Sequence, residues 1–165
     1  EAKIEDTHPL QTDSESPKTH FAYGFATQVV ILDDEGHIAK VIAAHDVGKV
    51  INPGSLKGQL EGSIHMGLGF ALTEEFKVRN GVPRNLTVNG QGLIRARRMP
   101  EIELILIEDK HPIGPYGAKG VGEIGLIPTA PAVAAALYRY DGIRRFKLPM
   151  RNSAASRFAR GAADC

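Results

Sequence analysis

Cysteine is almost absent from this sequence: of its 165 residues, only the last, Cys165, carries a thiol. No internal disulfide can therefore form, and a reducing compartment is compatible with the chain. An excess of charge is missing as well, because 20 Lys and Arg residues stand against 19 Asp and Glu residues. A near-neutral chain lacks the basic footprint of nucleic-acid-binding proteins, so we expect no nucleic-acid partner.

Long apolar stretches are also lacking. No run reaches the roughly 20 apolar residues that a membrane-spanning helix needs, and no segment has the pattern of a secretory signal peptide. These absences predict a cytoplasmic protein without a membrane partner. The sequence begins at Glu1 rather than at Met, so it stays open that the chain is a processed or excised piece.

Glycine, by contrast, is plentiful, and one glycine-rich segment stands out. The sequence GPYGAKGVGE at residues 114–123 contains four glycines and ends on one carboxylate, Glu123. Glycine allows backbone to approach a ligand closely or to adopt positive φ. The segment is therefore typical of a loop in which backbone surrounds a ligand and a carboxylate acts on it. Taken alone, it fits a solvated turn with an exposed glutamate equally well.

A second glycine-rich segment, residues 58–75, has helical periodicity. Asn52 and Pro53 predict where its helix starts, because Asn caps helix N-termini and Pro is favoured at the first helical position. We expect a helix over residues 53–73. The predicted apolar face consists of Leu56, Leu60, Ile64, Leu68 and Ala71. Four helical glycines, at 58, 62, 67 and 69, each cost about 0.5–1 kcal/mol relative to Ala, so we expect another backbone or a ligand to approach closely and offset that cost.

The remaining pattern predicts strands and one more helix. Strands are expected over residues 21–32, 38–47, 74–78 and 101–108, with a turn at Gly36 joining the first two. A second main helix is expected over residues 129–140, capped by Thr129 and stopped by Gly142. Together these elements predict an α+β fold with a mostly antiparallel sheet and two main helices.

A length of 165 residues suits one domain. Residues 1–19 are polar and without periodicity, and we interpret them as an extended arm or linker. Residues 20–150 form the predicted domain. Residues 151–165 are basic, show no apolar face and are predicted to be a flexible tail.

Several familiar motifs are missing. Residues 114–119 lack the Gly-Lys-Ser/Thr ending of a phosphate-binding loop, and Gly67 and Gly69 lack the third glycine of a dinucleotide fingerprint. The six histidines show no metal-ligand spacing, and no Ser-His-Asp or Cys-His set is present. His45 and Asp46 are adjacent, but neighbouring strand residues point to opposite faces, so we do not expect them to act as a catalytic pair.

Six motifs in register carry a resemblance to a known family. They are FAYG at 21–24, HDVGKVINP at 45–53, GQLEG at 58–62, MGLGFALTEE at 66–75, MPEIE at 99–103 and GPYGAKGVGE at 114–123. Together they closely resemble the C-terminal part of the molybdopterin-binding subunit of the xanthine dehydrogenase/aldehyde oxidase family. The sequences of these motifs are most similar to those of the bacterial xanthine dehydrogenase-like branch, which includes nicotinate and purine hydroxylases.

The resemblance implies a molybdenum hydroxylase that oxidises an N-heterocycle or an aldehyde, with a molybdenum–molybdopterin cofactor. In this family the metal is held by the pterin dithiolene, so no side chain of this chain is implied as a metal ligand. Glu123 matches the active-site glutamate, the general base, and Gln59 matches the glutamine that hydrogen-bonds the pterin. The other implied cofactor-binding residues are Gly58, Ala118, Lys119, Gly120, Val121 and Gly122.

The resemblance also implies partners. A complete subunit of this family is several times longer, so the chain would need the remainder of the molybdopterin subunit and would neither hold molybdopterin stably nor be active alone. Iron–sulfur and FAD groups are expected on partner subunits or domains, and the substrate is a small molecule. Residues 89–95 and the tail after Pro149 depart from the family pattern. Two alternatives stay open: a non-catalytic assembly module and an independent small-molecule-binding protein.

Overall fold

The computed structural model describes residues 23–112 and 114–161, and its sheet begins with a β-hairpin. Strand β1 (Ala26–Leu32) pairs antiparallel with β2 (Ile38–Asp46). The turn between them lies where the sequence predicted it: Gly36 has a φ of 79°, which favours glycine. The carboxylate of Asp33 stabilises the turn by accepting a 2.7 Å hydrogen bond from the backbone N–H of His37.

Strand β5 (Glu101–Ile107) lies on the other side of β2 and runs parallel to it. The chain between β2 and β5 includes a long helix, the kind of crossover that a parallel pair requires. A separate ribbon of β3 (Val78–Arg79) and β4 (Val82–Pro83) is antiparallel. The predicted mostly antiparallel sheet is thus confirmed, with β5 as the parallel exception. The strand predicted over residues 74–78 is wrong, because residues 74–77 are irregular.

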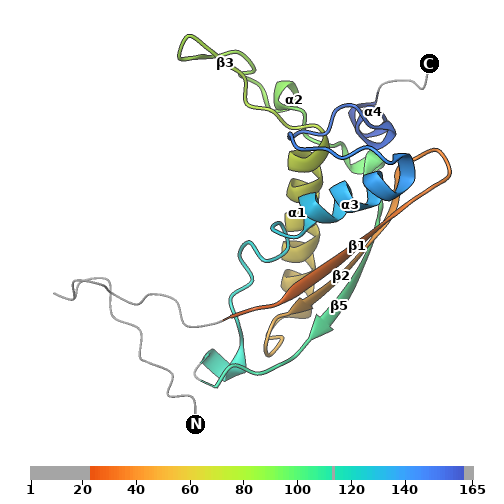
Figure 1. Ribbon diagram of the computed structural model, residues 1–165. Coiled ribbons are helices and arrows are strands. Elements are labelled where there is room, and N and C mark those ends of the chain that lie inside the picture. Colours follow the sequence, from red (N-terminus) through yellow and green to blue (C-terminus); the bar gives the residue numbers. More distant parts are fainter. Residues whose placement is uncertain (1–22, 113, 162–165) are drawn as a thin grey trace.

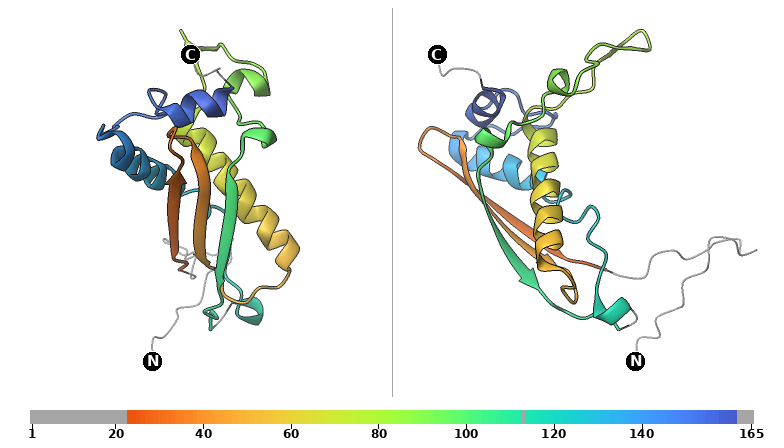
Figure 2. Two further views of the ribbon diagram at one scale, coloured as in Figure 1. Left: turned by 90° about the vertical axis from the view of Figure 1, so that its right-hand side faces the viewer. Right: turned by 180° about the vertical axis from the view of Figure 1, so that it is seen from behind.

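Helix α1 (Pro53–Leu72) confirms the predicted long helix. The side chain of Asn52 caps it by accepting a 3.0 Å hydrogen bond from the backbone N–H of Ser55. Of the predicted apolar face, Leu56 is only half-buried and the other four residues are buried. Figures 1 and 2 show α1 running beside the sheet, on the same side as α3.

Helix α3 (Thr129–Asp141) confirms the second predicted helix and ends at Gly142, which has a φ of 72°. The predicted cap at Thr129 is wrong, because Thr129 already lies in the first turn and its hydroxyl donates to the carbonyl of Gly125 at 3.0 Å. The two main helices meet at Gly67, where a Cβ would lie 2.5 Å from the Cβ of Thr129. Gly67 therefore makes the close approach expected of the helical glycines.

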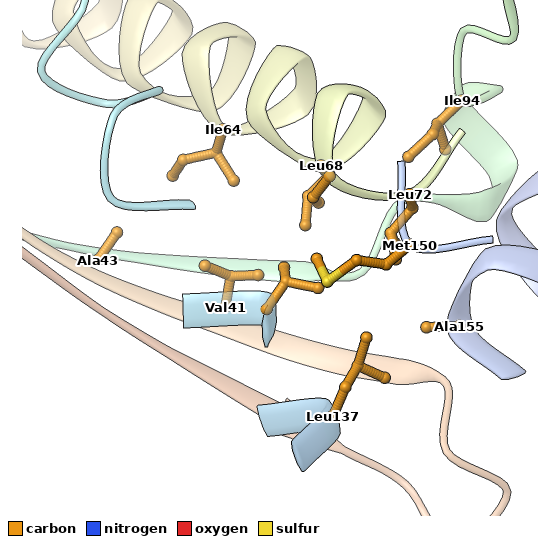
Figure 3. Packing of buried hydrophobic residues seen from close by; sticks show 11 residues of the cluster. Val41, Ala43, Ile64, Leu68, Leu72, Ile94, Leu137, Met150 and Ala155 are labelled. Atoms are coloured by element: carbon orange, nitrogen blue, oxygen red, sulfur yellow. The ribbon is translucent and has the colours of Figure 1, made fainter. Parts of the chain in front are cut away.

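The hydrophobic core lies between the sheet and the helices, as Figure 3 shows. Buried residues of β2, α1 and α3 meet there, and the chain after α3 closes one end of the layer. The cluster includes Val41, Ala43, Ile64, Leu68, Ala71, Leu72, Ile94, Val133, Leu137, Met150 and Ala155. No helix among residues 23–112 and 114–161 is long and apolar enough to cross a membrane.

No helix of the described residues covers the opposite face of the sheet (Figure 2), and apolar side chains lie on that face. The strand register places Val29 and Ile31 of β1 on this face, together with Ile105 and Ile107 of β5. Their exposed fractions lie between 42% and 52%. An open sheet face usually presents polar residues to water. This face does so only in part, because Lys40 pairs there with Glu101 and Glu103 while the four apolar side chains stay exposed.

The end of the chain differs from the flexible tail predicted over residues 151–165. Residues 154–160 form helix α4 (Ala154–Arg160), which Ser153 caps. Ala155 joins the core, and the hydroxyl of Ser156 donates to the carbonyl of Leu72 at 2.6 Å. The buried side chains of this helix are the small residues Ala155 and Ser156, and its one large apolar side chain, Phe158, stacks on the ring of His37 with centroids 4.4 Å apart. Residues 162–165 and the predicted arm, residues 1–19, lie outside the described residues.

Short helical turns complete the fold. Helix α2 (Val88–Gln91) and a 3₁₀ turn, Ala96–Arg98, occupy the segment before β5. A second 3₁₀ turn, Pro115–Gly117, opens the glycine-rich loop, and within it Tyr116 has a φ of 56°. Positive φ is uncommon for a residue with a bulky side chain.

Candidate functional site

The glycine-rich loop, residues 114–123, is held against the end of β2. The backbone N–H of Lys119 donates to the carbonyl of Val47 at 3.1 Å, and that of Lys49 donates to Gly117 at 2.9 Å. Gly48 allows this approach: its φ is 62°, and a Cβ there would lie 2.5 Å from the carbonyl oxygen of Gly117. Two motifs far apart in the sequence are therefore joined by backbone contacts.

A nearly buried ion pair reinforces this junction. The ammonium of Lys119 lies 2.6 Å from Oδ2 of Asp46, and the two side chains are 7% and 6% exposed. The hydrogen bond to Asp46 raises the pKa of Lys119 above its ordinary value. Asp46 also accepts a 3.3 Å hydrogen bond from the backbone N–H of Gly48. The side chain predicted to bind cofactor, that of Lys119, is thus directed into the junction between loop and sheet.

Sequence reasoning missed Asp46 as the partner of Lys119. The motif at 45–53 contributes to the family resemblance, but the only partner considered for Asp46 is His45, with which no pairing is expected. One signal was available: an acidic residue at the buried end of a strand needs a cation or several hydrogen bonds. The glycine-rich loop offers one cation, Lys119.

Gln59 connects helix α1 to the other end of the loop. Its Nε2 donates to the carbonyl of Gly122 at 2.9 Å. Its own backbone carbonyl accepts a 2.8 Å hydrogen bond from the hydroxyl of Ser63 one turn later. Two predicted site residues that are 63 positions apart are thus in direct contact.

A cavity of about 380 Å³ lies where β2, α1 and the loop meet. Four of the predicted site residues line it: Gln59, Ala118, Lys119 and Val121. Its other walls come from the connection between β2 and α1, within residues 47–52, and from the first turn of α1. Half of the predicted site residues thus share one concave surface, whereas Gly58, Gly120, Gly122 and Glu123 do not line it.

The three predicted site glycines face open space in the described part of the chain, as does Gly62 of α1. A Cβ added at Gly58, Gly120 or Gly122 would meet no atom within 4 Å, and the same holds for Gly62. Gly67 differs, because the neighbouring helix fills the space beside it. The chain's own packing therefore does not explain Gly58 and Gly62, which lie one turn apart on the exposed side of α1.

Glu123 ends the loop and is exposed. Its backbone carbonyl accepts hydrogen bonds from the N–H groups of Leu126 and Ile127, at 3.0 and 3.3 Å. These bonds form the turn that leads toward α3. The carboxylate itself is thus presented at the surface beside the open glycines.

Another cavity, with a volume of about 500 Å³, lies elsewhere among the described residues. It is lined mostly by residues 144–152 and includes none of the predicted site residues. Ion pairs occupy much of its polar lining: Arg145 binds Asp141 and Arg151 binds Glu75, each at 2.5 Å.

The donor set of the candidate site suits an organic cofactor better than a bare metal ion. It offers an amide side chain, small residues, exposed backbone and one carboxylate. No group of three or more His, Cys, Asp or Glu residues within 23–112 and 114–161 could hold a metal ion. A group that brings its own metal ligands, as a pterin dithiolene does, fits these residues.

Comparisons with known proteins identify the family. Residues 2–100 match the family model of the molybdopterin cofactor-binding domain. The chain is 36% identical over 138 residues to the 6-hydroxypseudooxynicotine dehydrogenase complex subunit gamma of Paenarthrobacter nicotinovorans, covering 79% of this chain and 17% of that relative. It is 32% identical over 115 residues to the xanthine dehydrogenase molybdenum-binding subunit of Escherichia coli O157:H7, covering 68% and 15%.

Comparison with a solved structure supports the same family. The aldehyde oxidoreductase from Desulfovibrio desulfuricans superposes with a TM-score of 0.66 at 29% identity, covering 74% of this chain and 13% of that chain. The chain thus spans less than a fifth of the length of these relatives. The family model ends at residue 100 and does not include residues 114–123. Since it matches more than half of the sequence, we conclude that this chain belongs to the molybdopterin cofactor-binding domain family, as its six motifs predicted.

Proposed function

We propose that this chain is the catalytic segment of a molybdenum hydroxylase that oxidatively hydroxylates an N-heterocycle or an aldehyde. One observation carries the proposal: the hydrogen bond from Gln59 to Gly122 joins the two glycine-rich segments at 2.9 Å. It places the open glycines and the loop that ends in Glu123 on one surface. When bound, the molybdopterin supplies the redox chemistry.

The residues of α1 and of the loop then have distinct tasks. Gln59 uses one amide N–H on Gly122 and keeps a second N–H and a carbonyl oxygen to offer to the pterin. Gly58, Gly120 and Gly122 let the cofactor lie against backbone, because no side chain stands between. The ion pair between Lys119 and Asp46 keeps the loop in place.

Glu123 acts as the general base in this proposal. Its exposed carboxylate accepts the proton of the attacking oxygen nucleophile, a role that typically contributes 10²–10⁴-fold to a rate. A base works best where water is excluded and its surroundings are fixed. Within this chain the carboxylate is open to solvent, so we expect the missing walls of the site to come from elsewhere.

The uncovered sheet face supports this incompleteness. Apolar surface is exposed on a face that no helix within 23–112 and 114–161 covers, at Val29, Ile31, Ile105 and Ile107. Relatives are much longer than this chain. We therefore assign this face to packing against the remainder of a molybdopterin-binding subunit. The family resemblance leads us to expect iron–sulfur and flavin groups on partner subunits or domains. A partner subunit is in keeping with the name of one relative, subunit gamma of a dehydrogenase complex.

The proposal is tested by cofactor retention in the molybdenum-loaded enzyme that contains this chain. Gln59→Ala should lower molybdenum and pterin content severalfold after gel filtration, because a direct amide contact is lost. Gln91→Ala in α2 is the matched control and should leave both contents unchanged. Unchanged cofactor content in Gln59→Ala would refute the assigned site and would favour a non-catalytic assembly module.

A further inference from the structure

The imidazole of His45 is buried and unpartnered. Its side chain lies on β2, and the residue is 0% exposed. Neither Nδ1 nor Nε2 has a hydrogen-bond partner in the described part of the chain. Burial lowers the pKa of His45, so the ring is neutral near pH 7. A neutral imidazole carries one donor nitrogen and one acceptor nitrogen, and both need a partner when buried.

Gln28 on β1 has a similar unmet requirement. Its Nε2 donates to the carbonyl of Gly125 at 2.8 Å, while its Oε1 is buried without a partner. In the β1–β2 register, Ala26 lies opposite His45 and Gln28 lies opposite Ala43. Gln28 and His45 are therefore diagonal neighbours on one face of the sheet, a spacing that long side chains can bridge.

This face of the sheet is the one that packs against α1. Ala43 lies on it and belongs to the core cluster together with Ile64 of α1. Polar atoms on a buried face are costly unless they are bonded. Three unpartnered polar atoms on neighbouring residues thus point to a shared small ligand.

The segment after Glu123 lies beside the same residues. The carbonyl of Gly125 accepts from Gln28 and from the hydroxyl of Thr129. A Cβ at Gly125 would lie 2.7 Å from the Cβ of Ser63, so the segment is wedged closely against α1. What fixes Gln28 therefore also fixes Gly125, two residues from Glu123.

We propose that His45 and Gln28 bind ordered internal water on the inner face of the sheet, and that this hydrated pair positions the segment that carries Glu123. One water donates to Oε1 of Gln28 and bonds the nearer nitrogen of His45, and a second serves the other nitrogen. Buried waters typically make about three hydrogen bonds to such groups. Two side chains offer too few ligands for a structural zinc ion, which takes four. Positioning the segment that carries Glu123 matters for catalysis only if Glu123 has its proposed role. The water site itself does not depend on that role.

The water site is tested directly in the 165-residue chain by nuclear magnetic resonance. Slowly exchanging water should give cross-peaks to the ring protons of His45. The Gln28→Leu variant should weaken them, because the bridging acceptor is removed. The ring of His65, which bonds the carbonyl of Ile94 at 2.8 Å, is the internal control and should keep its spectrum. Absence of the His45 cross-peaks in the unaltered chain would overturn the proposal.

A double-mutant cycle provides a second, independent measurement. His45→Leu and Gln28→Leu each leave the other residue's polar atoms unsatisfied, whereas the double variant removes both. The folding equilibrium constant of the double variant should exceed the value expected from additive effects by about fivefold or more. Additive effects would show that the two side chains do not share a ligand.

The positioning role is read from hydrogen exchange of the amides of Leu126 and Ile127, which bond the carbonyl of Glu123. In Gln28→Leu and His45→Leu these amides should exchange about tenfold faster or more. The amide of Gly142, which donates to Tyr138 at 2.9 Å at the far end of α3, should stay unchanged. Unchanged exchange at Leu126 and Ile127 would overturn the positioning role. None of these measurements depends on cofactor, so their failure is distinguishable from failure of the proposed function.

Discussion

Lys119 and Asp46 are 73 residues apart in the sequence, yet their side chains meet at 2.6 Å. The pair fastens the glycine-rich loop to the end of β2, beside the backbone bond from Lys119 to Val47. A loop rich in glycine loses much conformational entropy when it is ordered. The pair therefore supplies order that the loop's own sequence does not provide.

Removing one member of this pair should destabilise the chain more than removing both. Lys119→Met leaves the carboxylate of Asp46 nearly buried without its cation, and Asp46→Leu leaves the ammonium with only the exposed carboxylate of Asp109, 3.6 Å away. The double variant removes both charges and should recover part of the loss. Urea unfolding at pH 7 measures the difference. Lys49→Met, which breaks an exposed pair with Glu108, is the control and should have a smaller effect. A double variant at least as unstable as the worse single variant would contradict this view.

Replacing Gly67 or Gly58 of α1 with alanine should change the free energy of unfolding in opposite directions. Gly67→Ala should lower the free energy of unfolding, because the new Cβ would lie 2.5 Å from Thr129. Gly58→Ala should raise it by about 0.5–1 kcal/mol, because alanine favours helix and nothing occupies the space beside Gly58. In the molybdenum-loaded enzyme, Gly58→Ala should instead lower cofactor content. If Gly58→Ala leaves cofactor content intact, the open glycines do not face the cofactor.

Truncation should show that the chain after residue 152 is structural. A chain ending at residue 161 should unfold like the full chain. A chain ending at residue 152 loses the buried Ala155 and the hydrogen bond from Ser156 to Leu72, and should be less stable by on the order of 2 kcal/mol. Thermal and urea unfolding of both truncated chains measure this. Equal stability of the two would restore the prediction of a flexible tail.

Acid should destabilise the chain through His45. Burial lowers the pKa of His45 from its ordinary value of 6.5. The unfolded chain therefore takes up a proton near pH 6.5, whereas the folded chain does so only at lower pH. Stability from this group is complete above pH 6.5 and falls as the pH drops below it.

The contribution of His45 is isolated by comparing the unaltered chain with His45→Leu. Between pH 6.5 and 5.5 the unaltered chain should lose more stability, by at most about 1.4 kcal/mol per pH unit. Other titrating groups are common to both proteins and cancel in the difference. Parallel stability curves would mean that His45 is protonated in the folded state as readily as in the unfolded one.

Local rules of sequence were enough for several elements. The cap at Asn52 and the turn at Gly36 both follow from preferences of single residues for particular backbone conformations, and the structure contains both. The resemblance assigned Gln59 and Gly122 to one cofactor site but did not predict their direct contact.

Contacts between segments that are distant in the sequence could not be predicted from such local preferences. The parallel pairing of β5 depends on the path of the chain between strands, which alternation of apolar residues does not encode. Helix α4 is buried through Ala155 and Ser156, and such small residues give a weak periodic signal. The exposure of Glu123 depends on which segments pack around it, and the sequence of the loop does not encode that packing.

The central claim is that Glu123 is the general base, and turnover per bound molybdenum in the intact enzyme tests it most directly. Glu123→Gln preserves size and should leave fold and molybdenum content nearly unchanged, while turnover per molybdenum falls by roughly 10²-fold or more. Glu61→Gln on the nearby α1, where the carboxylate lies 3.6 Å from Lys57, is the matched control and should keep normal turnover. If turnover per molybdenum in Glu123→Gln stays within about threefold of the unaltered enzyme, the loss is smaller than a general base contributes. In that case Glu123 is not the base, and the loop is a solvated turn.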